Sequence, residues 1–272
     1  MEPLDAAGEN KAIAALLEWY VEQGVDYAVD EEPHDRFAET AAPVSIRTVA
    51  PETIAPKIAT APAAVATAVL LTPDEALHEA RSRAVNAATL EELRTLIESF
   101  EGCGLMKTAT RLVFADGTPG SRVMLVGDAP GADEDREGRP FVGRSGQLLD
   151  KMLLAIGLAR KDVYIANIVP WRPPGNRKLT PQETAVCLPF ILRQIELCRP
   201  DILICLGELS AQTLLEQREG ISKLRGRWFD VASGDRIIKA LATLHPDYLL
   251  RLPLQKRLVW RDMLALKAAL NA

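Results

Sequence analysis

The chain has 272 residues, of which 48% are hydrophobic, and its 37 acidic and 32 basic side chains give a net charge of −5. This length allows one large domain with extensions or two small domains, and the hydrophobic content is sufficient for a core. No run of about 18 apolar residues is present, which excludes a membrane-spanning helix. We expect a cytoplasmic protein, because the acidic N-terminus lacks the basic region of a signal peptide and the four cysteines are too few for a disulfide framework.

The net charge is divided unevenly along the chain. Residues 1–100 carry a net charge of −11, and residues 101–272 carry +6. Such an asymmetry indicates contact of the basic part with nucleic acid or with a membrane. An ordinary basic domain beside a solubilising acidic segment explains the same charges equally well.

The N-terminal part consists of an acidic segment and a linker. Within residues 1–40, residues 10–23 have the apolar spacing of an amphipathic helix. Residues 41–73 are mostly Ala, Pro, Thr and Val without a lasting period, which predicts a disordered linker. The helix at 10–23 either binds a protein partner or folds back on residues 74–272, which we predict to be the functional domain.

From about residue 72 the sequence predicts alternating helices and strands. Thr72, Thr89 and Thr180 each precede a helical pattern as an N-cap, and further helices are predicted at 145–156, 209–217 and 255–270. Apolar runs predict four buried strands, at 122–127, 163–169, 201–207 and 237–244. This alternation predicts an α/β fold in which a parallel sheet of four strands is covered by helices on both faces.

Unusual residues follow three of these strands. Residues 127–146 read GDAPGADEDREGRPFVGRSG, residues 166–177 read ANIVPWRPPGNR, and residues 244–251 read LHPDYLLR. In an open parallel sheet, ligands bind beyond the carboxyl ends of the strands. We therefore expect the three segments to form one site at that edge.

The first segment combines glycines, carboxylates and one aromatic residue. It contains no dinucleotide-binding or P-loop motif, so the sequence argues against a nucleotide cofactor or an NTPase. The carboxylates Asp128, Asp133, Glu134 and Asp135 suit general-base work or stabilisation of a cation; a solvated acidic turn is the alternative. Phe141 either offers a stacking surface or packs the loop down.

The other two segments supply an amide, an imidazole and a basic turn. Asn167 lies in an apolar strand, where a buried amide needs partners in the protein or on a ligand. The turn at 172–178, RPPGNRK, suits contact with phosphate. His245 follows a strand end directly, and it is either structural or part of the same site as Asn167.

These three segments resemble the motifs of the uracil-DNA glycosylase superfamily, most closely its family 4 branch, over about residues 100–265. The resemblance implies a three-layer α/β/α sandwich around a four-stranded parallel sheet. It also implies base flipping in DNA, single- or double-stranded, by an enzyme that we expect to be a monomer.

The resemblance also implies roles for single residues. Phe141 would stack on a flipped uracil, Asn167 would bind its Watson–Crick edge, and His245 would donate a hydrogen bond to O2 of the departing base. The remaining predicted contacts lie on the substrate and on DNA: Ala129 in the pocket, Leu249 and Leu250 as a wedge in the base stack, and Arg172, Asn176, Arg177 and Arg251 on the phosphates.

Two features differ from the family 4 pattern. The first motif has Asp128 where a glutamate is usual, and Ala129 where another branch has aspartate, so the water-positioning residue is either Asp128, which we prefer, or Glu134. Family 4 enzymes typically hold an iron–sulfur cluster on four cysteines. Here only Cys103 and Cys187 match, whereas Phe100 and Trp171 stand at the other two positions.

We therefore expect no cofactor and no metal, with Phe100 and Trp171 packed in the space of the cluster. The leading hypothesis is a monofunctional glycosylase that hydrolyses the N-glycosidic bond of uracil in DNA and leaves an abasic site. The alternatives are a glycosylase-derived DNA-binding protein without turnover, a protein that traps the sugar covalently, and a glycosylase for another deaminated base.

Overall fold

The computed structural model describes residues 72–271. The expectations for the acidic segment at 1–40 and for nearly all of the linker at 41–73 lie outside this range. The described part begins with two helices, α3 (Pro73–Asn86) and α4 (Leu90–Glu98), which are capped by Thr72 and Thr89 as the sequence predicts. At Thr72 the cap is a capping box completed by Glu75.

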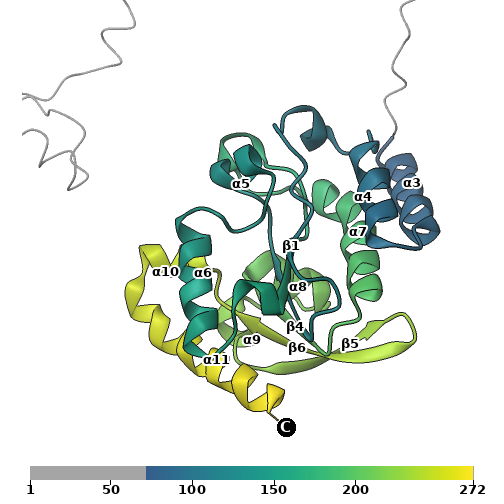
Figure 1. Ribbon diagram of the computed structural model, residues 1–272. Coiled ribbons are helices and arrows are strands. Elements are labelled where there is room, and N and C mark those ends of the chain that lie inside the picture. Colours follow the sequence, from purple (N-terminus) through teal and green to yellow (C-terminus); the bar gives the residue numbers. More distant parts are fainter. Residues whose placement is uncertain (1–71, 272) are drawn as a thin grey trace, which may run out of the picture. The chain divides into compact units, whose positions relative to one another are not determined.

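A six-stranded sheet forms the centre of the domain (Figure 1). Its strand order is β1-β3-β2-β4-β6-β5. The four inner strands are parallel to one another, and each of the two edge strands is antiparallel to its neighbour. The strands are β1 (Asp116–Gly117), β2 (Val123–Gly127), β3 (Val163–Asn167), β4 (Ile202–Leu206), β5 (Trp228–Ser233) and β6 (Arg236–Thr243).

The four inner strands are those expected from the apolar runs, and the two edge strands were missed. Strand β1 has only two residues, which is too short for any sequence pattern. Strand β5 alternates between exposed and half-buried positions and is joined to β6 by a two-residue turn at Gly234 and Asp235. An edge strand with one face in solvent lacks the continuous apolar run by which the others were recognised.

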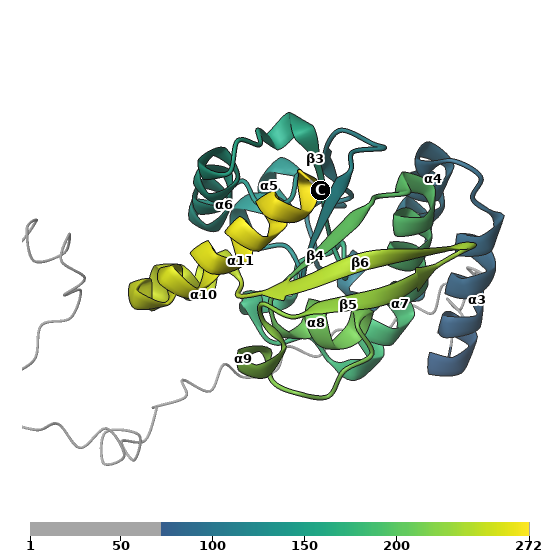
Figure 2. The same ribbon diagram turned by 90° about the horizontal axis from the view of Figure 1, so that it is seen from below.

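Helices cover both faces of the sheet, as expected (Figure 2). One buried cluster joins the sheet to α3, α4, α7, α8 and α9, and a second joins the opposite face to α6, α10 and α11. Beyond α4 the helices are α5 (Ala132–Glu137), α6 (Arg144–Ala155), α7 (Pro181–Cys198), α8 (Glu208–Leu214), α9 (Ile221–Leu224), α10 (Pro246–Arg251) and α11 (Lys256–Leu270). Short 3₁₀ turns lie at Gly104–Lys107, Arg160–Asp162, Pro174–Asn176 and Pro253–Gln255. Among the helices of residues 72–271, none combines the length and the apolar character that a membrane span requires.

The sheet register brings two predicted site segments together. Strands β2 and β3 are parallel and pair Gly127 with Asn167, so both strands end at the same level. Strand β6 ends at Thr243, two residues before His245 caps helix α10. The carboxyl edge of the sheet therefore collects residues from all three segments.

Candidate active site

A cavity of about 640 Å³ lies at this carboxyl edge. Its walls come from the loop after β2, the end of β3, the turn before α7, the start of α8 and helix α10. Most of the predicted site residues line it, namely Asp128, Ala129, Glu134, Phe141, Asn167, Asn176, Arg177, His245 and Arg251. The expected convergence of the three segments is thus observed, whereas Arg172, Leu249 and Leu250 are not part of the wall.

Asn167 and Phe141 meet above Gly127. A Cβ atom added to Gly127 would lie 2.6 Å from Asn167 Oδ1 and 2.6 Å from Phe141 Cζ. Only glycine leaves room for this approach. Asn167 is 4% exposed, and its buried Oδ1 accepts no hydrogen bond from any of the described residues.

Phe141 lies in a turn with an unusual backbone. Its φ of 52° is in the left-handed region, which bulky residues rarely adopt. The residue is buried, and its ring centroid lies 5.4 Å from that of His245 with 30° between the ring planes. The side chain therefore packs against the wall of the cavity and presents part of its ring to it.

Glu134, one of the two candidates for positioning water, is used by the backbone. Its Oε1 accepts hydrogen bonds from the amides of Val142 and Gly143, both at 3.0 Å, and its Oε2 accepts one from Gly131, also at 3.0 Å. These bonds fix the carboxylate as a brace inside the loop. Glu134 therefore shapes the loop while it lines the cavity, and its role in holding water stays a prediction.

Asp128 is the carboxylate that remains available. Its Oδ1 accepts a hydrogen bond of 2.9 Å from the amide of Ser210 at the start of α8, while burial raises the pKa of the carboxyl group. His245 and Ser210 act in the opposite direction on this pKa. Gly207 allows the contact with α8, because a Cβ there would lie 3.0 Å from Asp128 Oδ2.

His245 is fixed in one orientation by helix α10. Its Nδ1 accepts a hydrogen bond of 3.1 Å from the amide of Asp247, so the proton of the neutral ring lies on Nε2. Burial lowers the pKa of His245, against the opposing charges of Asp128, Asp247 and Glu134. A neutral imidazole with a donor at Nε2 is the form that this site favours.

Basic side chains lie in and beside the wall of the cavity. Arg177 is paired with Glu183 at 2.6 Å and lowers the pKa of that carboxyl group to about 2. Arg251 is paired with Asp247 at 3.1 Å and remains exposed. Arg172 donates through Nε to Asn176 Oδ1 at 2.7 Å, so it supports the basic turn from outside the cavity wall.

The two leucines expected to form the wedge are not exposed. Leu249 is 1% exposed and belongs to the core beneath α10, so its role as a wedge stays a prediction that its burial does not favour. Leu250 is half-buried. Two leucines that follow the last turn of α10 are exposed, Leu252 at 47% and Leu254 at 86%, and neither is part of the cavity wall.

Several other residues of the site gave no signal in the sequence. The sequence indicates at Gly127 only a close approach of the backbone to a ligand, not the contact between Asn167 and Phe141, and Ser210 lies in a helix that no motif connects with the site. Arg160 contacts the Phe141 turn from the 3₁₀ turn that precedes β3. In each case the contact joins segments that are distant in the sequence, and no local pattern reports it.

The cysteines do not fit an iron–sulfur cluster. Cys103 and Cys187 are buried with their Sγ atoms 3.9 Å apart, while Phe100 and Trp171 are buried in the same core. Residues 72–271 contain no group of three or more His, Cys, Asp or Glu side chains arranged to hold a metal ion. A four-thiolate cluster needs four such donors, and these positions supply two.

Comparison with known proteins agrees with the fold and with the motifs. The model of the uracil DNA glycosylase superfamily matches residues 114–264. Type-4 uracil-DNA glycosylases from Archaeoglobus fulgidus and Thermotoga maritima are 39% and 40% identical to this chain over 169 and 168 residues. These matches cover 61% and 60% of this chain, and 85% and 86% of the two relatives. A type-4 uracil-DNA glycosylase from Pyrobaculum aerophilum is 38% identical over 168 residues, or 60% of this chain and 86% of the relative. The chain therefore belongs to the uracil DNA glycosylase superfamily.

Proposed function

We propose that this protein excises uracil from DNA by hydrolysing the bond between the base and the deoxyribose. The similarity to type-4 uracil-DNA glycosylases supports the reaction, and the cavity at the carboxyl edge of the sheet supports its location. The product is an abasic site in an otherwise intact strand.

Recognition of uracil rests on Asn167, and its unpaired oxygen is the single observation that carries the proposal. A buried acceptor without a partner costs about 1–3 kcal/mol, and a ligand with an N–H group relieves this cost. Uracil offers N3–H to Asn167 Oδ1 and O4 to the amide NH₂. Cytosine presents an acceptor and a donor in the reverse order, so a fixed amide rejects it.

Cleavage rests on His245 and Asp128. As the glycosidic bond breaks, its electron pair moves onto uracil, and the Nε2–H of His245 stabilises the charge that develops at O2. The carboxylate of Asp128 stabilises the cationic sugar and holds the water whose oxygen adds to C1′. Bond cleavage, addition of the water oxygen to C1′ and transfer of a water proton to the uracil anion together yield uracil and the abasic sugar.

We assign contact with DNA to basic side chains at the cavity and to exposed leucines after helix α10. Arg177 and Arg251 suit phosphate contacts, as does the basic turn that includes Arg172 and Asn176. Leu252 and Leu254 are exposed after helix α10, which contributes to the cavity wall, and we assign to Leu254 the role of filling the gap left by the flipped base.

We also propose that the reaction needs no iron–sulfur cluster. Two observations support this: the thiols of Cys103 and Cys187 contact each other, and Phe100 and Trp171 stand at the other two cluster positions. Iron and sulfide analysis of protein purified without oxygen tests the point. Less than about one tenth of an equivalent of iron is expected, and stoichiometric iron and sulfide would contradict it.

The reaction itself is tested with single- and double-stranded oligonucleotides that carry one uracil, followed by alkaline cleavage of abasic sites. We expect strand cleavage at uracil and none at cytosine in the same sequence. DNA binding without cleavage of either substrate would favour a binding protein without turnover. A protein–DNA adduct that survives denaturation would indicate covalent trapping instead.

A further inference from the structure

The turn that carries Phe141 has a backbone that needs support. A φ of 52° is strained for a residue other than glycine, so contacts elsewhere must hold it. Gly146 at the start of α6 presses directly on this turn, because a Cβ there would lie 1.7 Å from the carbonyl oxygen of Phe141. The turn is therefore confined on the side of α6 by a residue that cannot be enlarged.

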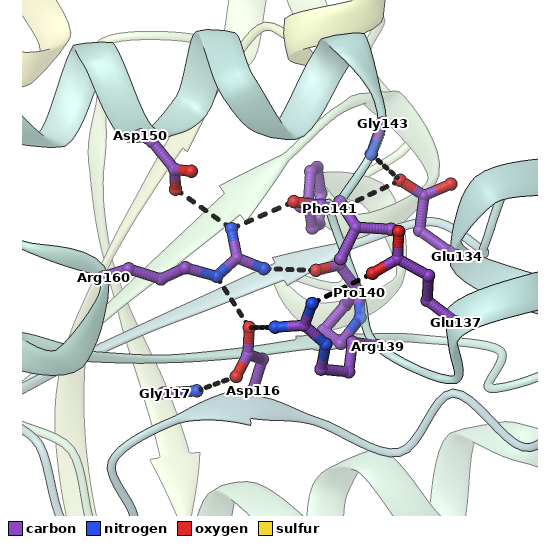
Figure 3. Close-up of polar contacts among 11 residues, drawn as sticks. Asp116, Gly117, Glu134, Glu137, Arg139, Pro140, Phe141, Gly143, Asp150 and Arg160 are labelled. Carbon is purple, nitrogen blue, oxygen red and sulfur yellow. Dashed lines mark hydrogen bonds and ion pairs between the residues drawn. The ribbon is translucent and has the colours of Figure 1, made fainter.

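Arg160 holds the carbonyl side of the turn (Figure 3). Its Nη1 donates to the carbonyl oxygen of Phe141 at 2.9 Å, and its Nη2 donates to that of Pro140. The same guanidinium pairs with Asp116 at 2.6 Å and with Asp150 at 2.9 Å. One side chain thus joins the edge strand β1 and helix α6 to two consecutive carbonyl groups.

Glu134 holds the amide side of the same turn. Its Oε1 accepts from Val142 and Gly143, the two residues that directly follow Phe141. Carbonyl groups before the bend are therefore bound by a cation, and amide groups after it are bound by an anion. Figure 3 shows the two side chains on either side of the Phe141 turn.

The guanidinium is well suited to this position. Burial disfavours its charge, but hydrogen bonds and attraction from Asp116 and Asp150 more than offset this and raise the pKa of Arg160. The planar fork of five donors serves four acceptors in fixed directions, which an ammonium group cannot do.

We propose that Arg160 is a positioning residue for base recognition, which with Glu134 clamps the Phe141 turn so that the aromatic ring forms the stacking wall of the cavity. Arg160 is absent from the cavity wall and acts through the backbone of Phe141. The inference rests on the proposed function, because the base that stacks on Phe141 is the uracil of that reaction.

The clamp predicts a loss that is specific to the base. In Arg160→Gln, the inhibition constant of free uracil and the KM for a single-stranded uracil oligonucleotide should each rise about tenfold, since stacking on a misplaced ring is weakened. The Kd for a duplex with an abasic site, which has no base to stack, should stay within about twofold of wild type. Arg160→Lys keeps the positive charge but not the planar set of donors. Its uracil inhibition constant and its KM should lie between those of wild type and those of Arg160→Gln.

The matched control is Arg122→Gln. Arg122 also joins a carboxylate and a carbonyl group, Asp201 at 2.9 Å and Leu270 O at 3.1 Å, but it lies outside the cavity wall. This variant should leave all three constants unchanged.

Three outcomes decide the matter. Unchanged uracil inhibition and KM in Arg160→Gln would overturn the clamp. An equal loss of affinity for the abasic duplex would also overturn it, because the effect would then be a general loss of structure. A wild-type protein that neither excises uracil nor is inhibited by it would instead contradict the proposed function.

Discussion

Asn167 Oδ1 and the Phe141 ring share the space above Gly127, each 2.6 Å from where a Cβ of that residue would lie. Gly127 ends strand β2 and pairs with Asn167 in the neighbouring strand, so the approach is built into the sheet register. Its φ is not in the left-handed region, and only the missing side chain matters.

Gly127→Ala should therefore separate the two groups and reduce kcat/KM for uracil excision about 100-fold, the effect of a displacement of about 1 Å at a reacting site. Gly104→Ala is the matched control, since a Cβ at Gly104 meets nothing within 4 Å. Steady-state excision by the two variants checks this. Wild-type activity in Gly127→Ala would mean that the packing above Gly127 does not set the site.

His245→Ala should slow excision about 100- to 1000-fold, the usual effect of removing one donor to a developing anion. His78→Ala, on the exposed side of α3, should have no effect. Burial lowers the pKa of His245, so its ring should stay neutral as the pH falls from 8 to the ordinary histidine pKa near 6.5. Protonation of His245 should therefore not reduce the wild-type rate in this pH range. Single-turnover excision rates of the variants and of wild type, measured across this pH range, test both expectations. A wild-type rate that changes with a pKa near 6.5 would contradict a neutral His245 imidazole.

Asp128→Asn should abolish most excision and yet stabilise the fold. Because burial raises the pKa of Asp128, the native state binds its proton more tightly than the unfolded chain does, and the wild-type protein loses stability as the pH rises through that pKa. The variant lacks this loss, so its Tm should exceed that of wild type by a few degrees at neutral pH, with a smaller gap in acid. Calorimetry at several pH values checks the trend. A gap that widens in acid would show that the pKa is lowered instead.

Leu249→Ala should reduce the stability of the protein, whereas Leu254→Ala should reduce its activity on double-stranded DNA. The first removes a side chain from the core and should reduce the free energy of unfolding by about 2–5 kcal/mol. The second should leave stability unchanged but reduce excision from double-stranded DNA about tenfold, with little effect on single strands that have no stack to fill. Excision from both substrates and urea unfolding separate these effects. Equal activity of Leu254→Ala on both substrates would reject the assigned wedge.

The sequence predicts the inner sheet and most helices because apolar runs and threonine caps are local signals. Asn167 was identified because a polar residue in an apolar strand stands out. The sequence gives only a preference for Asp128 over Glu134, because the amide groups that bind Glu134 are brought to it only by the folded loop. The clamp of Arg160 was invisible because its partners Asp116 and Pro140 lie 44 and 20 residues away.

The central claim, that Asn167 reads uracil, is tested most directly by comparing uracil excision by wild type and Asn167→Asp. A carboxylate keeps the size of the amide but offers no donor to O4, so kcat/KM should fall at least about 100-fold. The control Asn86→Asp, at the exposed end of α3, should match wild type. Activity of Asn167→Asp within about threefold of wild type would contradict the account.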